Sequence, residues 1–515
     1  MAKRKRGTAE AAGQPRAPKS RKEDVAMRPG KEAALMGKAS TVTSDTKARV
    51  VDQVAESGDA QPETTTIQVV TGSYERVLHG FAAAIPQGAL TGSADNASMP
   101  AADKPKVDFT DTFLFNAHAS SIRCLAISPL SDETSKVTLA TGSTDERINL
   151  YSISTAPPVV SKNNPKLPSL HGGSITENPK NKELGSLLHH ASNITALYFP
   201  TRSKLLSSAE DSTIAITRTR DWTALSTIKA PIPKPQGRPS GDTAGPGEVP
   251  AGINDFAVHP SMKLMVSVGK GEKCMRLWNL VTGKKAGVLN FGRDILTAVG
   301  EGRFGSGEGR RVIWDHEGEE FAVGFERGVV VFNIDSKPKG KIVPMPRTKI
   351  HQMHYLSSKS HPAMLLVSTE DGRILLYDTN TTTTNDDATA EKSKDDIPSS
   401  RLVAQIGGPA AGMSGRVKDF EIISTPADSY IVVAGSSDGT VRFWALDEKD
   451  LEDDADAGKA KGFTALQVGN LLGSYSTGTR ITCLKAFAMT GKPDEEQEED
   501  GNEKDVADSS ADDSE

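Results

Sequence analysis

The stretch VVAGSSDGTVRFW, which runs from Val432 to Trp444, decides how this chain folds. An apolar run and small polar residues come first, then the dipeptide Asp438-Gly439, then a run in which apolar residues alternate up to an aromatic residue. Asp-Gly between two alternating runs is a strong signal for a β-hairpin, because both residue types accept the backbone angles of a tight hairpin turn. The stretch therefore predicts two antiparallel strands joined by a short turn.

The same pattern recurs along the chain. Clear copies are LATGSTDERINLY (Leu139–Tyr151), LLSSAEDSTIAIT (Leu205–Thr217) and LLVSTEDGRILLY (Leu365–Tyr377), and weaker copies are LMVSVGKGEKCMRLW (Leu264–Trp278) and FAVGFERGVVVFN (Phe321–Asn333). Six hairpins of one kind in order indicate an internal repeat, in which each unit buries its apolar faces against its neighbours.

Each hairpin is preceded by a further strand with apolar residues at positions i, i+3 and i+5. The clear starting residues of these first strands are Ile122, Ile194, Ile253, Ile350, Val417 and Ile481. The first strand of the fourth unit fits the pattern poorly and is expected to end at Trp314. Phe256 and Phe420 occupy the i+3 position, so we expect both in the core.

The seven first strands are followed by only six hairpins, and the missing hairpin lies at the other end of the chain. VVTGSYERVLHGF (Val69–Phe81) aligns without gaps on VVAGSSDGTVRFW, and a strand-like run at Thr112–Phe115 follows it. Residues Ile481–Ala486 are therefore expected to pair with these N-terminal strands and close a ring, which removes the free sheet edges that invite aggregation. The predicted fold is all-β, a seven-bladed β-propeller closed by N-terminal strands.

The repeat resembles the WD repeat over about residues 67–489. The resemblance implies a network within each blade, in which a loop His, a strand Ser or Thr, a turn Asp and a Trp share hydrogen bonds. The matching residues are His118, Asp145, His190, Asp211, Asp371, Asp438 and Trp444. We expect them to brace the blades and to carry no chemistry; Asp371 and Asp438 have no obvious His partner.

Longer segments resemble the p21-activated-kinase-interacting protein 1 family, whose fungal members are the maintenance-of-killer WD proteins of large-subunit ribosome assembly. These segments are VVTGSYERVLHGF, LLHHASNITALYF, LMVSVGKGEKCMRLWNLVTG and RVKDFEII with the hairpin after it. The resemblance implies a nucleolar protein that acts on precursors of the large ribosomal subunit and restrains a p21-activated kinase. The acidic C-terminal end departs from the basic end expected of animal members.

Two functions follow from this resemblance. The first is a non-catalytic scaffold that docks on the RNA and protein of the large-subunit pre-ribosomal particle in the nucleolus. The second is an adaptor that binds a p21-activated protein kinase and holds it inactive. Both would use a face of the propeller, so the fold does not separate them.

The net charge of −6 hides an asymmetry between the two ends of the 515 residues. Residues 1–66 are expected to form a disordered basic tail and residues 490–515 a disordered acidic tail. Two basic clusters resemble a bipartite signal for a nuclear import receptor, although a generic basic tail that coats RNA is the alternative. The residues of the two clusters are Lys3, Arg4, Lys5, Arg6, Lys19, Arg21 and Lys22.

Four insertions rich in Pro, Ser, Thr or Asp interrupt the repeats. They lie near residues 156–182, 231–250, 379–400 and 447–462. Such composition, over such lengths, predicts disordered loops between strands of the propeller at residues 67–489.

No motif for catalysis, a cofactor or a metal ion stands out. GEGRFG at Gly300–Gly305 has the spacing GxGxxG but neither the preceding strand nor the following helix of a dinucleotide site. His351 and His354 are three apart on a predicted strand and so point to opposite faces. No apolar run approaches the ~20 residues of a membrane span. We expect a monomeric nuclear protein that is no enzyme, needs no cofactor and does not enter a membrane.

The residue before each first strand should lie on one rim of the ring. This residue is Ser121, Asn193 and Gly252 in the first three units and Lys349, Arg416 and Arg480 in the last three. Three cations at one repeat position on adjacent blades predict a basic arc for RNA phosphates or a partner, which Arg310 and Arg311 extend. The alternative is that each cation pairs with a nearby acid and has no further role.

Overall fold

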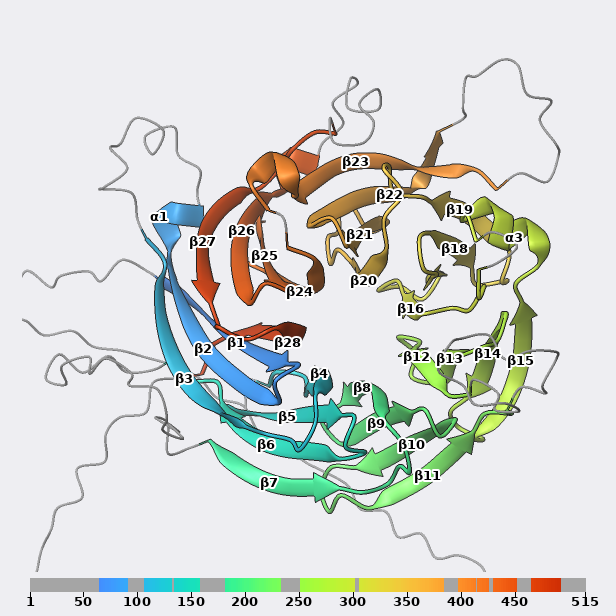
Figure 1. Ribbon diagram of the computed structural model, residues 1–515, viewed down its shortest axis with the longest axis horizontal. Coiled ribbons are helices and arrows are strands. Elements are labelled where there is room, and N and C mark those ends of the chain that lie inside the picture. Colours follow the sequence, from blue (N-terminus) through green and yellow to red (C-terminus); the bar gives the residue numbers. More distant parts are fainter. Residues whose placement is uncertain are drawn as a thin grey trace, which may run out of the picture. The chain divides into compact units, whose positions relative to one another are not determined.

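The computed structural model describes residues 64–90, 106–131, 134–157, 181–232, 251–301, 305–383, 397–413, 415–425, 429–451 and 465–491. Within these residues the strands form five four-stranded sheets and one eight-stranded sheet, set around a common centre (Figure 1). The predicted import residues Lys3–Arg6 and Lys19–Lys22 lie outside the described residues, as do the acidic tail from residue 492 and most of each insertion. The prediction of a β-propeller is confirmed.

Four blades are separate antiparallel sheets, and each begins at the residue that the repeat pattern predicted. From the centre outwards they are β4 (Ile122–Ile127), β5 (Lys136–Ser143), β6 (Ile148–Ser154) and β7 (Lys182–Leu187); β8 (Ile194–Thr201), β9 (Lys204–Ala209), β10 (Thr213–Arg218) and β11 (Ala224–Lys229); β12 (Ile253–Val258), β13 (Leu264–Gly269), β14 (Cys274–Asn279) and β15 (Lys284–Asn290); and β24 (Val417–Ser424), β25 (Ser429–Ser436), β26 (Thr440–Asp447) and β27 (Asn470–Ser476).

The eight-stranded sheet consists of two further groups of four strands, joined where their outer strands meet. The groups are β16 (Arg311–Trp314), β17 (Glu320–Gly324), β18 (Val329–Asn333) and β19 (Pro338–Ile342), and β20 (Ile350–Tyr355), β21 (Met364–Thr369), β22 (Arg373–Thr383) and β23 (Ser399–Gly407). The join is a parallel pairing of β19 with β23 at Lys341 and Ser399.

Two predicted insertions are partly ordered. Strand β22 continues into the insertion predicted at residues 379–400, because Thr382 and Thr383 pair with Ser400 and Ser399 of β23 and β-branched Thr favours strands. The insertion predicted at residues 447–462 begins with the short helix η2 (Glu448–Leu451), whose Leu451 is buried. Three other short helices occur among the described residues: α1 (Gln87–Leu90), α3 (Arg293–Ala298) and η1 (Pro409–Ala411).

The remaining blade joins the two ends of the described chain. It is built from β28 (Ile481–Ala488), β1 (Thr64–Ser73), β2 (Val77–Pro86) and β3 (Asp108–Asn116). Strand β1 pairs antiparallel with β28, from Ile67 opposite Ala488 to Ser73 opposite Ile481 (Figure 1). The predicted closure by N-terminal strands is therefore present, although β1 begins at Thr64, ahead of the predicted boundary at residue 67.

A β-bulge explains the i, i+3, i+5 pattern of the innermost strands. In β4 the pairing register shifts between Ile122 and Cys124, and in β24 it shifts between Val417 and Asp419. A bulge adds one residue to one strand and so interrupts the alternation of side chains between the two faces. Shifts at the corresponding place also occur in β8, β12 and β20.

The bulges place polar side chains where they join one blade to the next. Asp255 of β12 accepts a hydrogen bond from the backbone N–H of Val312 in β16 (3.1 Å). Asp419 of β24 accepts one from the backbone N–H of Leu484 in β28 (2.9 Å). Because each carboxylate bonds the innermost strand of the following blade, these aspartates fix neighbouring blades at the centre of the ring.

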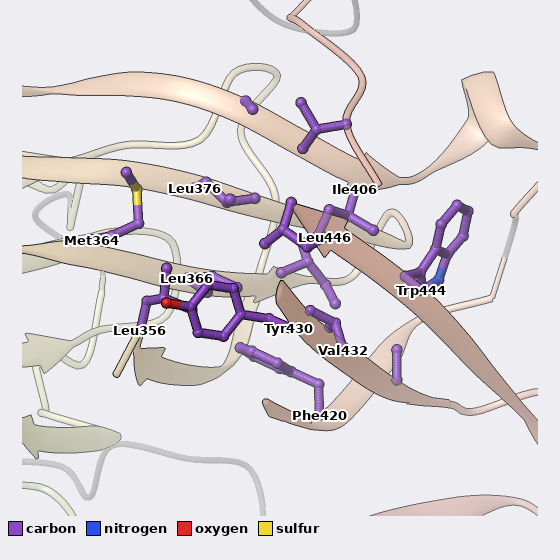
Figure 2. Close-up of a cluster of buried hydrophobic side chains, with 14 of the residues drawn as sticks. Leu356, Met364, Leu366, Leu376, Ile406, Phe420, Tyr430, Val432, Trp444 and Leu446 are labelled. Atoms are coloured by element: carbon purple, nitrogen blue, oxygen red, sulfur yellow. The ribbon is translucent and has the colours of Figure 1, made fainter. Parts of the chain in front are cut away.

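Apolar clusters fill the space between neighbouring blades. One cluster packs Leu366 and Leu376 of the β20–β23 group against Phe420, Val432 and Trp444 of the β24–β27 blade (Figure 2). Phe420 is fully buried and Phe256 is 5% exposed, so the prediction that both lie in the core is confirmed.

Removing the closing strands should expose a sheet edge. A chain that lacks residues 1–63 keeps β1 and should unfold in one cooperative thermal transition. A chain that lacks residues 1–86 loses β1 and β2 and leaves β28 without its partner, so its melting temperature and cooperativity should fall. Calorimetry of the two truncations checks this expectation, and equal transitions would contradict closure through β1.

The substitution Phe420→Ala should lower the free energy of unfolding by about 3–5 kcal/mol, because it opens a cavity in a fully buried cluster. Phe115→Ala is the matched control, since the Phe115 side chain is only half-buried and should lose less. Denaturant midpoints measure both changes. A loss below about 1 kcal/mol for Phe420→Ala would show that the side chain does not pack as described.

Candidate functional site

Six blades share one backbone arrangement at the rim where their innermost strands begin. In each of these blades, the backbone N–H of the first residue of the hairpin turn donates a hydrogen bond. The acceptor is the carbonyl oxygen of the residue that directly precedes the innermost strand of the same blade. The accepting residues are Ser121, Asn193, Gly252, Lys349, Arg416 and Arg480, at N–O distances of 2.9–3.2 Å. The predicted arc residues Lys349, Arg416 and Arg480 therefore occupy equivalent positions. Their strands are neighbours, since β24 contacts both β20 and β28.

Most of these cations pair with carboxylates, as the alternative interpretation of the arc proposed. Lys349 Nζ lies 3.0 Å from Glu326 Oε1, which belongs to the hairpin turn of the preceding blade. Arg416 Nε lies 3.1 Å from Glu370 Oε1, in the equivalent turn. These side chains are nearly half exposed, and exposed ion pairs contribute only about 0–1 kcal/mol. They can therefore exchange a carboxylate for another anion at little cost.

The two further residues predicted to extend the arc also have acidic partners. Arg310 Nη2 lies 3.4 Å from the same Glu326 that binds Lys349, so the structure brings these two cations together. Arg311 Nη1 lies 3.9 Å from Asp255, deeper along the innermost strands.

Arg480 differs from the other arc residues. Glu326 and Glu370 occupy the same position in the hairpin turns of two successive blades. In the next blade, β24–β27, which directly precedes Arg480, this position is occupied by Ser437. In the described part of the chain, the guanidinium of Arg480 has no carboxylate within ion-pair distance. It lies instead 5.7 Å from the centre of the Tyr74 ring, a cation–π distance. Aligning the turns would have revealed this difference, because it is a Glu-to-Ser change at one repeat position.

Lys418 is a further cation at this rim that the sequence reasoning missed. It lies on β24, and its Nζ is 3.5 Å from His351 Nε2 on β20. Burial, followed by the positive charges of Arg416 and Arg480, lowers the pKa of Lys418. Burial and the positive charges of Lys418 and Arg311 lower the pKa of His351 to about 3, so His351 is neutral at neutral pH.

The first two blades contain the predicted bracing networks. His118 Nδ1 lies 3.1 Å from Asp145, and its Nε2 lies 2.7 Å from Thr141 Oγ1. His190 makes the equivalent contacts with Asp211 (3.3 Å) and Ser207 (2.8 Å). Burial lowers the pKa of His118. Burial raises the pKa of Asp211, but hydrogen bonds from His190 and Thr213 outweigh it and lower that pKa overall.

Arginine replaces histidine where Asp371 and Asp438 lacked an obvious partner. The Arg373 side chain is 1% exposed, and its Nη2 lies 2.6 Å from Asp371 Oδ2. Arg442 Nη2 lies 3.6 Å from Asp438 Oδ2. A third acid–arginine pair joins Glu272 and Arg276 on the β12–β15 blade.

The expected hydrogen bond of Trp444 is not formed. The side chain is buried, but its indole N–H has no hydrogen-bond partner among the described residues. The pattern had assigned Trp444 to a blade network, yet it acts only as a packing residue in the cluster of Figure 2. Trp278 forms the predicted kind of bond instead, from its Nε1 to Ser267 Oγ at 2.8 Å.

His351 and His354 do not converge on one point. The His354 ring packs edge-on against the Phe420 ring, with ring centres 4.8 Å apart, whereas His351 faces Lys418. The described residues contain no group of three or more His, Cys, Asp or Glu side chains that could hold a metal ion. Nor is any helix among them long and apolar enough to cross a membrane.

Comparisons with known proteins agree with this architecture. The family model "WD domain, G-beta repeat" matches residues 109–152 and 414–445. The "p21-activated protein kinase-interacting protein 1-like" protein of Xenopus laevis is 25% identical over 426 residues, which cover 83% of each chain. "Protein MAK11" of Saccharomyces cerevisiae is 27% identical over 406 residues, or 74% of this chain and 78% of MAK11.

A shorter match links the chain to a second protein that is named for binding a kinase. "Shk1 kinase-binding protein 15" of Schizosaccharomyces pombe is 25% identical over 254 residues, or 48% of this chain and 53% of the relative. The chain is thus a WD-repeat protein related over most of its length to the p21-activated-kinase-interacting protein 1 and MAK11 family, as the sequence predicted.

Proposed function

We propose that this protein is a non-catalytic scaffold in the assembly of the large ribosomal subunit, where it docks on the RNA and protein of the pre-ribosomal particle. The observation that carries the proposal is the basic rim, where Lys349, Arg416 and Arg480 occupy one repeat position on three adjacent blades. Cations on a rigid face suit RNA phosphates, because most of the affinity of such complexes comes from backbone charge. The family resemblance supplies the particle as the source of that RNA.

A second function is supported by the names of the relatives. An adaptor that binds and negatively regulates a p21-activated protein kinase would fit the names "p21-activated protein kinase-interacting protein 1-like" and "Shk1 kinase-binding protein 15". The same rigid propeller can present different faces to RNA and to a kinase, so the two functions are compatible. A purified kinase that the full chain neither binds nor inhibits would exclude the adaptor role.

The cellular place of this scaffold follows from its function. Assembly of the particle requires access to the nucleus and nucleolus, and the basic clusters near the N-terminus would bind a nuclear import receptor. The protein would enter as a monomer, because the strand that could pair with a second copy after the last repeat, β28, is already paired with β1 of the same chain.

The triple change Lys349→Glu, Arg416→Glu, Arg480→Glu should release the protein from large-subunit precursors on sucrose gradients. It replaces three rim cations by anions, which repel RNA phosphate. Its melting temperature should change little, because exposed ion pairs contribute only about 0–1 kcal/mol.

The matched control for the triple change is Lys136→Glu, Lys204→Glu, Lys284→Glu. It alters net charge equally at exposed lysines that begin β5, β9 and β15, at the ends of these strands that lie away from the rim. The control should co-sediment with the particles as wild type does. A folded rim variant that also does so would rule out the rim as the docking surface.

Nuclear import should depend on the basic clusters. Replacing Lys3–Arg6 and Arg21–Lys22 with Ala removes the charges that an import receptor recognises, so a fluorescent fusion should accumulate in the cytoplasm. The melting temperature serves as the control and should not change. A fusion that stays nuclear after both replacements would show that a partner carries the protein in.

A further inference from the structure

Lys418 and Arg480, which belong to neighbouring blades, have no carboxylate partner in the described part of the chain. Lys418 contacts only the neutral ring of His351, and Arg480 contacts only the Tyr74 ring through its guanidinium. The acids around them are otherwise engaged: Glu370 binds Arg416, and Asp419 accepts hydrogen bonds from the backbone N–H groups of Leu484 and Phe420. The Glu75 carboxylate accepts a hydrogen bond from the backbone N–H of Arg480 (2.9 Å) and forms no ion pair with its guanidinium. The positive charge here is therefore available to an external anion.

These cations follow one another along the rim. Lys418 lies two residues after Arg416 on β24, and Lys349 and Arg480 directly precede the two innermost strands, β20 and β28, that contact β24. They come from the starts of three neighbouring innermost strands, so the positive charge extends along the rim and is not confined to one point. An extended polyanion satisfies such an arrangement better than a single anionic group does.

An exposed aromatic ring adjoins this charge. Tyr74 lies at the tip of the β1–β2 hairpin, and 61% of its surface is exposed, the largest exposed fraction among the described aromatic residues. Its ring is held beside the Arg480 guanidinium. Proteins that bind single-stranded nucleic acid combine basic side chains along the backbone with aromatic rings on which bases stack. A single-stranded RNA would use both features, with its phosphates on the cations and a base on the Tyr74 ring.

We propose that the rim around Lys418, Arg480 and Tyr74 is a binding site for single-stranded RNA, in which Lys418 holds a backbone phosphate and Tyr74 stacks on a base. A lysine ammonium suits this role because it binds phosphate as a point charge, without the fixed geometry of arginine. The neutral His351 accepts from the Lys418 ammonium and so positions it. This site deepens the proposed function, on which it rests for the class of ligand.

The test measures the salt dependence of binding to a labelled single-stranded RNA of about 12 nucleotides. Lys418→Gln should reduce the slope of log K against log salt by about 0.7, the contribution of one phosphate contact in a single strand. Lys418→Arg, which keeps the charge, should retain most of the slope. Lys284→Gln is the control at an exposed lysine of β15. Every protein compared contains residues 1–63, so any RNA binding by this segment contributes equally to all of the salt slopes.

The stacking contact has a separate readout. Tyr74→Ala should weaken RNA binding roughly 5- to 150-fold without changing the salt slope, because stacking on an aromatic ring involves no counterion release. Tyr74→Phe keeps the ring and should bind as wild type does. Melting temperatures establish that each variant is folded.

Several outcomes would overturn the site. An unchanged slope for folded Lys418→Gln would do so, as would a wild-type protein that does not bind the RNA. A phosphoserine peptide serves as competitor. If it displaces the labelled RNA at a lower concentration of phosphate groups than unlabelled RNA requires, the rim is a site for a protein partner instead. Sucrose gradients separate this inference from the proposed function. If the protein binds RNA as described but never sediments with pre-ribosomal particles, the RNA site is supported and the proposed function is contradicted.

Discussion

The pairing of β28 with β1 is the constraint on which the rest of the molecule depends. It joins strands from opposite ends of the described chain and completes the four-stranded closing blade. It also assembles the rim, because Arg480 directly precedes β28 and Tyr74 directly follows β1. The cation–π contact between these two residues therefore exists only in the closed ring. Closure stabilises the propeller and builds the candidate RNA site in one step.

Charged residues divide between two tasks according to their depth. On the innermost strands, the carboxylates of Asp255 and Asp419 bond the backbone of the next blade. Further out, on β22, Arg373 is buried against Asp371. Such groups stabilise the blades and are unavailable to a ligand. At the rim, Lys349 and Arg416 are nearly half exposed and only weakly held by their acids. A count of charged residues does not distinguish those that brace the blades from those at the rim, whereas their burial does.

The blade networks show how one fold tolerates different chemistry at equivalent positions. The first two blades use His with Asp, as in the WD repeat, and later blades use Arg with Asp or Glu. Either a histidine ring or an arginine guanidinium satisfies the carboxylate of the turn, so the hairpin is held in the same way in both kinds of blade. Trp444 shows the reverse case, because packing alone holds it in place. The degraded repeat signature thus reflects substitution of partners, with the architecture retained.

The sequence alone determined the hairpins, the first residues of the innermost strands, the closing strand and the burial of Phe256 and Phe420. These features depend on local periodicity and turn chemistry, which the chain carries wherever it folds. It placed Lys349, Arg416 and Arg480 on one rim for the same reason. Only the tertiary structure decided that Lys349 and Arg310 share Glu326, that Lys418 faces His351, and that β19 meets β23. Those contacts join residues from different blades, and their distances are set by the geometry of the ring rather than by spacing along the chain.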